Sequence, residues 1–297
     1  MPSTEDSNDR FADLDLWTDQ QILEALVDDQ ARAVVAVRQA APAIAAAARA
    51  MADGLRQGGR LIYAGAGSSI SIAVQDGAEL PGTFGLARDR IHFLIAGGIP
   101  SLTDIDGAAE DDAEAGRQAA LALACAKHDV LIGVSASGRT AYTLAAADVA
   151  AKAGATVITL ANNSPSPLLQ VATHPIHLAT GAEVIAGSTR MGAGTAQKCA
   201  LGLLSTLTQI RLGNVYGGMM VNVQADNAKL RQRAIAMVRR ITKVDAERAA
   251  QALETSNGHV KPAALICAGA FDLAAAQRLL HDNNNNLRLA LEALARS

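Results

Sequence analysis

The chain has 297 residues, a formal net charge of −3 at pH 7, and a composition that is 50% hydrophobic but only 3% aromatic. This length suits one large α/β domain, or one domain with a small appendage, built around an aliphatic core. The slight acidity argues against a nucleic-acid partner, which normally requires a basic face. No run of about 20 apolar residues is free of charge, so no membrane span is expected.

The N-terminal segment MPSTEDSNDR is acidic and polar, unlike a signal peptide or a transit peptide. The three cysteines, Cys125, Cys199 and Cys267, are scattered in apolar runs and predict buried free thiols. The histidines show no metal-ligand spacing beside acids, so neither a metal nor another cofactor is expected. These features fit a protein of the reducing cytoplasm.

Residues 1–18 predict an N-terminal arm, and Thr18 with Gln21 forms a capping-box signal for a helical region that reaches about residue 55, with a break near Pro42. Strands and helices then alternate. The predicted strands are 61–64, 91–95, 130–134, 156–160 and 176–178, and the helices between or after them are about 69–79, 108–126, 141–153 and 192–212. Strands that are apolar on both faces and separated by helices predict an α/β fold with a doubly wound parallel sheet, whose ligands bind at the carboxyl ends of the strands.

Beyond Gly217 the pattern is wholly helical. The predicted helices are about 225–240, 243–254, 261–268, 271–281 and 286–296. We therefore expect an arm (1–18), a ligand-binding α/β domain (19–240) and a small all-helical C-terminal domain (241–297).

Three turns rich in glycine and hydroxyl side chains follow predicted strands. The first contains Gly67, Ser68 and Ser69, and it opens a helix. Glycine lets the main chain approach a ligand, and the N–H groups of a helix N-terminus suit a phosphate. A tight strand-to-helix turn also needs small residues for purely structural reasons, so this turn alone leaves both interpretations open.

The other two turns favour the phosphate. The second contains Ser135, Ser137, Gly138, Arg139 and Thr140, in which Arg139 adds charge-assisted hydrogen bonds, although Thr140 also suits a helix N-cap. The third contains Ser188 and Thr189, with Lys198 on the helix that follows. Three such turns at corresponding strand ends favour a phosphorylated ligand over three coincidental caps.

The order GAGSS, SASGRT and NNSPSP after successive strands resembles the sugar isomerase (SIS) fold. More narrowly, the chain resembles the N-acetylmuramic acid 6-phosphate etherase family over nearly its whole length. The matching segments are DGAE at 76–79, IAGG at 95–98, AED at 109–111, SGRT at 137–140, GSTR at 187–190, GTAQK at 194–198 and VKP at 260–262. The resemblance implies an SIS core, a phosphorylated amino sugar as substrate, and a homodimer with its sites near the subunit interface.

Glu79 and Glu110 match the catalytic glutamates of that family, as acid and base respectively, whereas from spacing alone each is more typical of a solvated helix residue. The implied activity is a carbon–oxygen lyase of peptidoglycan recycling, which releases D-lactate and leaves N-acetylglucosamine 6-phosphate. Ser71 and Ser7 stand where the family has arginines. A different phosphosugar, a non-catalytic phosphosugar sensor and an aldose–ketose isomerase therefore stay open as alternatives. Retention of both glutamates favours an enzyme over the sensor.

Overall fold

A computed structural model describes residues 3–104, 107–223 and 228–296. Its centre is a five-stranded parallel sheet in the order β2-β1-β3-β4-β5. The strands are β1 (Leu61–Gly65), β2 (Ile91–Ile95), β3 (Val130–Ser135), β4 (Thr156–Ala161) and β5 (His174–His177). β1 and β3 are buried along their whole length, as apolar strands covered on both faces must be. The predicted α/β fold with a doubly wound parallel sheet is confirmed.

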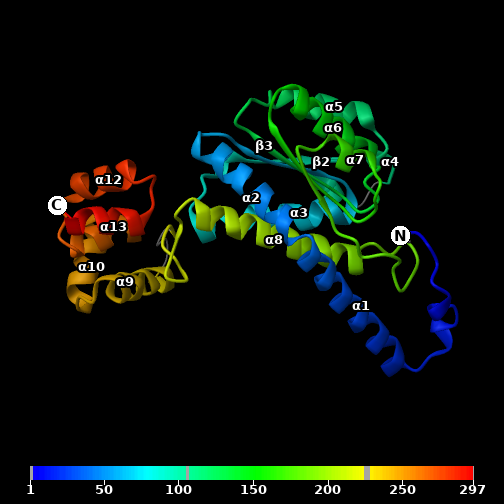
Figure 1. The fold of residues 1–297 in the computed structure, drawn as a ribbon, viewed down its shortest axis with the longest axis horizontal. Helices are drawn as coiled ribbons and strands as arrows, with labels where there is room; N and C mark the ends of the chain where they lie inside the picture. Colours follow the sequence, from blue (N-terminus) through cyan, green and yellow to red (C-terminus); the bar gives the residue numbers. More distant parts are fainter. Residues whose placement is uncertain (1–2, 105–106, 224–227, 297) are drawn as a thin grey trace. The chain divides into compact units, whose positions relative to one another are not determined.

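Helices cover both faces of the sheet (Figure 1). One face carries α5 (Ala113–Ala122), α6 (Ala141–Lys152) and α7 (Pro167–Val171), and the other carries α2 (Ala41–Arg56), α3 (Gly67–Phe84) and α8 (Gly192–Arg211). The small side chain of Ala146 in the first of these layers belongs to the same buried cluster as Ile62 and Leu131 of the sheet. Such alanines allow helices to lie close to the sheet and build a core with few aromatics.

A buried polar network fixes α3 and α8 to the sheet. The Tyr63 hydroxyl donates to Asp76 Oδ2 at 2.7 Å, and Ser205 Oγ donates to Asp76 Oδ1 at 2.8 Å. Burial raises the pKa of Tyr63 well above its usual value, so its proton stays on the hydroxyl. A Cβ at Gly77 would lie 2.7 Å from the Tyr63 and Phe93 rings, so this glycine lets α3 approach the sheet directly.

The N-terminal part begins with two short 3-10 helices, Asp9–Phe11 and Leu14–Leu16. Helix α1 (Asp19–Gln39) then starts at the predicted capping box, in which Thr18 and Gln21 exchange hydrogen bonds. The break before α2 falls at Ala40, and Pro42 lies in the first turn of α2, where its missing N–H costs nothing.

Several details differ from the sequence prediction. Met219–Met220 forms a strand, although the pattern beyond Gly217 predicts only helices, and the strand predicted at 176–178 lies at His174–His177. The single helix expected at 108–126 is divided into α4 (Gly107–Glu110) and α5, because Asp112 accepts a hydrogen bond from Ala115 N and caps a new helix. Helix α3 continues past Glu79 and through Pro81 to Phe84. Cys125, Cys199 and Cys267 are free thiols, but each is half-buried rather than buried.

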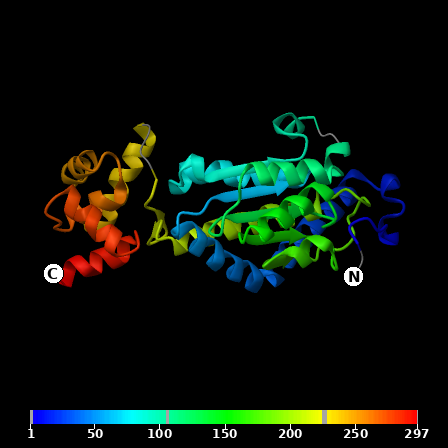
Figure 2. The same cartoon turned by 90° about the horizontal axis from the view of Figure 1, so that it is seen from above.

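A second packed unit comprises residues 79–88 and 208–297. It holds a hairpin of β6 (Val215–Tyr216) and β7 (Met219–Met220) and a group of helices, α9 (Ala228–Thr242), α10 (Ala246–Thr255), α11 (Val260–Cys267), α12 (Leu273–Asp282) and α13 (Leu287–Arg296) (Figure 2). Their core includes Met237, Leu253 and Leu265. Positions 225–227 of the predicted helix lie outside the described residues, and the limits 1–18, 19–240 and 241–297 stay a prediction.

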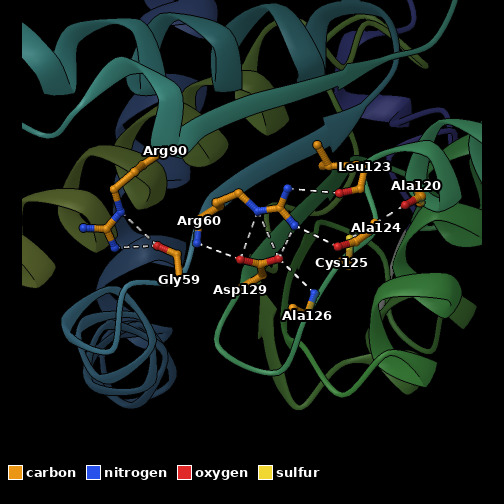
Figure 3. A network of polar contacts seen from close by, with 9 residues as sticks. All are labelled: Gly59, Arg60, Arg90, Ala120, Leu123, Ala124, Cys125, Ala126 and Asp129. Carbon is orange, nitrogen blue, oxygen red and sulfur yellow. Dashed lines mark hydrogen bonds and ion pairs between the residues drawn. The ribbon is translucent and has the colours of Figure 1, made fainter.

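An ion pair joins the amino ends of β1 and β3 (Figure 3). Arg60 donates to both carboxylate oxygens of Asp129 and, through the rest of its guanidinium, to Leu123 O and Ala124 O. Burial opposes ionisation of Asp129, but the Arg60 hydrogen bonds outweigh it and lower the pKa of the carboxyl group. Arg90 likewise donates to Leu55 O and Gly59 O. The charged groups of Arg60, Asp129 and Arg90 thus form hydrogen bonds within the protein.

In the described ranges no helix combines the length and the apolar character that a membrane crossing requires.

Candidate functional site

The strand order reverses between β1 and β3, since β2 lies on one side of β1 while β3, β4 and β5 follow on the other. Gly65 pairs with Val134 in the parallel register, so the loops after these two strands begin side by side. In open α/β sheets such a switch point forms a crevice at the carboxyl ends of the strands, where ligands bind. The first two predicted turns both lie at this crevice.

The first turn is short, because only Ala66 separates β1 from α3. Gly67 has φ +52°, a left-handed conformation that favours glycine. The first N–H groups of α3 have no acceptor within the helix, and they give its N-terminus a partial positive charge. Ser68 and Ser69 are half-buried, and neither side chain bonds to another of the described residues. The turn thus offers free donors for an anion.

The second turn is held by its own hydroxyls. Ser135 Oγ accepts from Gly138 N at 3.0 Å, and Ser137 Oγ accepts from Arg139 N at 3.1 Å. Ser135 and Thr140 are buried, with their hydroxyl oxygens 2.8 Å apart. The Arg139 side chain is exposed and makes no ion pair within the described part of the chain. Ser137 Oγ also lies within hydrogen-bond distance of Ser135 Oγ, at 3.3 Å, so Arg139 is the group of this turn that keeps free donors for a ligand.

Glu110 lies against this turn. Thr140 Oγ1 donates to Glu110 Oε1 at 2.7 Å. Because the single hydroxyl proton of Thr140 is used there, Ser135 must donate in its bond to Thr140. A directed chain of hydrogen bonds thus runs from the Gly138 amide through two hydroxyls to the carboxylate. Within the described residues Oε2 of Glu110 makes no hydrogen bond, which leaves this oxygen for a substrate proton.

Unlike the first turn, the third turn precedes a helix whose N-terminus is already occupied. Glu183 is buried and accepts from Gly192 N and Ala193 N, both at 2.9 Å, so the N-terminus of α8 already holds a carboxylate. Burial raises the pKa of Glu183, and the hydrogen bonds from the two amides oppose that shift. No local capping pattern in the sequence indicates this role, because Glu183 lies nine positions before Gly192. Any ligand here must use the half-buried side chains of Ser188 and Thr189.

The start of α8 lies close both to the third turn and to α3, the helix that follows the first turn. A Cβ at Gly194 would lie 3.3 Å from Thr189 O and 3.4 Å from Ile72 Cδ1 of α3. Lys198 is exposed on α8 and, among the described residues, has no hydrogen bond or ion pair. The structure therefore brings Thr189 to the helix that carries Ser68 and Ser69, and leaves Lys198 free in solvent.

A polar cavity of about 240 Å³ opens beside the second turn. Its lining residues come from the N-terminus and from the loops after β3, β4 and β5: Ser3, Arg139, Asn162, Asn163, Ser164, Pro165, His177, Ala179 and Gly181. Arg139 supplies the charge of this lining. A small anionic or polar group fits such a cavity best.

Glu79 has an exposed side chain inside α3. It lies about three helical turns after Gly67, or roughly 18 Å along the helix axis. Its expected pairing with Glu110 stays a prediction.

Comparison with known proteins extends these observations. A family model described as SIS domain matches residues 27–162. An N-acetylmuramic acid 6-phosphate etherase from Deinococcus radiodurans is 45% identical, over 93% of this chain and 91% of its own. The chain belongs to the N-acetylmuramic acid 6-phosphate etherase family. Two further relatives agree. N-acetylmuramic acid 6-phosphate etherase 1 from Bacillus licheniformis is 38% identical over 99% of this chain and 97% of its own. The N-acetylmuramic acid 6-phosphate etherase from Streptomyces avermitilis is 40% identical over 99% of this chain and 94% of its own. Among solved structures, a phosphoheptose isomerase from Francisella tularensis matches 65% of this chain and 98% of its own, with 24% identity and a TM-score of 0.49.

In this etherase-family chain, two of the segments that carried the resemblance lie at the crevice, namely the first turn and the second turn with Glu110, and a third forms the loop before α8. The contact of Glu110 with Thr140 joins residues 30 positions apart, and no local pattern in the sequence indicates it.

Proposed function

We propose that the protein cleaves the D-lactyl ether of N-acetylmuramic acid 6-phosphate and forms N-acetylglucosamine 6-phosphate and D-lactate. The observation that carries this proposal is the carboxylate of Glu110, which Thr140 holds at 2.7 Å beside turns with free anion-binding donors. An exposed carboxylate without such a partner would suit a solvated surface. A carboxylate with one oxygen fixed and one open suits proton transfer.

In the proposed mechanism, the N-terminus of α3 with Ser68 and Ser69 binds the phosphate, and Arg139 adds further donors. Ring opening places an aldehyde at C1, which makes the C2 proton acidic. Glu110 removes that proton as general base, and the electron pair forms the C2–C3 double bond as the C3–O bond breaks. Glu79 supplies a proton to the departing lactate oxygen. Water then adds to the double bond, with its hydroxyl at C3 and a proton at C2, so the net reaction is hydrolysis of the ether.

We further propose a homodimer in which the acid comes from the second copy. Leu23, Val27 and Val34 of α1 are 61%, 64% and 50% exposed, and their spacing puts them along one side of the helix. Such an apolar stripe supports a subunit contact. Glu79 of the same chain lies about 18 Å along α3 from the anion-binding end, so we assign the role of the acid to the partner subunit's Glu79. The free thiols fit the reducing cytoplasm, where we place this step of peptidoglycan recycling.

The test is release of D-lactate from purified protein and N-acetylmuramic acid 6-phosphate, beside a panel of other 6-phosphosugars. Glu79→Gln and Glu110→Gln should each abolish release while binding of N-acetylglucosamine 6-phosphate survives. Glu114→Gln is the matched control, because Glu114 lies on the surface of α5 and bonds to Arg117 and Gln118. Lactate release near the wild-type rate from Glu110→Gln would end this mechanism. Tight phosphosugar binding without turnover by the wild type would indicate a sensor.

Mixing the two inactive variants tests the shared site. If each site combines Glu110 of one subunit with Glu79 of the other, a mixed dimer keeps one intact site, and re-equilibrated mixtures recover up to about one quarter of wild-type activity. No recovery from dimers shown to have exchanged subunits would place both glutamates in one chain.

A further inference from the structure

The segment Ser3–Asp6, which we call the N-terminal strap, is an ordered turn. Ser3 N donates to Asp6 Oδ2 at 2.7 Å, and Asp6 N donates back to Ser3 O at 3.1 Å. Thr4 between them is 0% exposed. Residues this close to a chain end are usually poorly ordered unless other parts of the protein hold them. A fully buried threonine in such a segment therefore needs specific partners.

Thr4 has partners on two loops far away in the sequence. Its N–H donates to Asn163 Oδ1 at 3.0 Å, and Asn163 Nδ2 donates to Thr4 Oγ1 at 2.9 Å. Its carbonyl oxygen accepts from Gly187 N at 3.1 Å. The side chain of Glu5 also lies against this loop, because its Oε2 is 3.0 Å from the position that a Cβ at Gly187 would take. In Figure 1 the arm returns from the far end of α1 to the loop before α8, in agreement with these contacts.

Both partner loops adjoin the candidate site. The loop after β4 is fixed to the second turn, since Asn162 N and Asn163 N donate to Ala136 O and Leu168 N donates to Gly138 O. Gly187 directly precedes Ser188 and Thr189 of the third turn. Asn163 also lines the cavity beside Arg139, together with Ser3 of the strap. The strap therefore links the second and third turns, which the sheet alone does not connect.

We propose that Thr4 is a positioning residue of the substrate site, which it serves by holding the loop after β4 and the third turn in the spacing that one phosphosugar requires. This inference rests on the proposed function for the nature of the substrate. Thr4 does not contact Glu110. Its loss should therefore weaken substrate binding without slowing the chemical step.

The main variant is Thr4→Val, which keeps the shape and the two main-chain bonds but leaves the half-buried Asn163 Nδ2 without its acceptor. We expect KM for N-acetylmuramic acid 6-phosphate, and Kd for N-acetylglucosamine 6-phosphate, to rise roughly tenfold. Turnover should stay within about twofold of wild type. Thr4→Ser restores the acceptor and should restore both constants.

Two further variants separate positioning from general stability. Asn163→Ala removes this bond and also the acceptor of the Thr4 N–H, so the double variant with Thr4→Val should bind no more weakly than Asn163→Ala alone. Thr18→Val is the matched control, because Thr18 caps α1 and accepts from Gln21 N away from the site. It should lower the melting temperature and leave KM unchanged.

Hydrogen–deuterium exchange of ligand-free protein examines the strap without any turnover. Thr4→Val should speed exchange in 185–191, which contains the Gly187 amide, whereas Thr4→Ser and Thr18→Val should not. Unchanged exchange, or faster exchange with unchanged KM and Kd, would overturn the proposal. A wild-type protein that releases no lactate would refute the proposed function instead. The positioning role of Thr4 would then be tested by the Kd for the phosphosugar and by hydrogen–deuterium exchange.

Discussion

Thr140→Val isolates the hydrogen bond that holds Glu110. Valine has nearly the shape of threonine but can neither donate to Glu110 Oε1 nor accept from Ser135 Oγ, the bonds of 2.7 and 2.8 Å in the wild type. The carboxylate then loses the contact that fixes its orientation. We therefore expect this substitution to act on turnover.

The size of the effect follows from the type of bond. A hydrogen bond to a charged group contributes about 1.5–3 kcal/mol, which corresponds to a fall in kcat of about 10–100-fold if all of it is used in the transition state. The variant also leaves the buried Ser135 hydroxyl without its acceptor, which should cost the fold about 1–3 kcal/mol. Binding of N-acetylglucosamine 6-phosphate should change by less than about threefold, because the phosphate donors stay in place.

The assay compares D-lactate release, phosphosugar binding and urea unfolding for four proteins. Thr140→Ser keeps the hydroxyl and should retain most of the turnover. Thr143→Val is a matched control on the same helix, since the buried Thr143 hydroxyl has no hydrogen-bond partner in the described structure. It should leave kcat unchanged and stability equal or higher. A folded Thr140→Val protein with wild-type kcat would refute the role given to this bond.

Three further predictions concern binding and stability. The double variant Ser68→Ala, Ser69→Ala should raise KM about 10-fold or more with little change in melting temperature, because neither hydroxyl bonds to a described residue; an unchanged KM would remove these serines from the site. Asp129→Asn should destabilise by about 3 kcal/mol at pH 7 because it breaks a buried pair, and the difference from wild type should shrink as the pH falls through the lowered pKa of Asp129. Burial lowers the pKa of Lys261 to about 7. Between about pH 7 and about pH 10.5 the unfolded chain therefore binds one more proton than the folded protein, so the free energy of unfolding should rise by up to about 1.4 kcal/mol per pH unit. Urea titrations should find this slope absent in Lys261→Met.

The strands were predictable because their residues carry the signal locally. Ile91–Ile95 was predicted at its observed limits, and the capping box at Thr18 was predicted from two residues three positions apart. The turn after β1 was predictable in the same way, since glycine is favoured where the chain turns with φ +52° at Gly67. Strands, caps and tight turns were therefore predictable, because a few neighbouring residues determine each of them.

Contacts between distant segments could not be predicted in this way. Thr4 and Asn163 are separated by 159 positions, and no spacing rule relates two residues whose loops meet only after the sheet has formed. The extension of α3 beyond Glu79 was missed for another reason. Pro81 is a helix-breaking signal, yet the helix continues through it to Phe84, so the local preference is overridden.

The two ends of the sheet use their polar groups in opposite ways, and this contrast locates the site independently of any motif. At the amino ends, the Arg60 guanidinium is shared among Asp129 and two carbonyl oxygens, which use four of its five N–H donors. At the carboxyl ends, the side chains of Ser68, Ser69 and Arg139 meet no described residue. Donors that the fold does not use are available to a ligand, whereas most of those of Arg60 are already bonded within the protein. This contrast supports the proposal that the substrate binds at the carboxyl end, where Glu110 also lies.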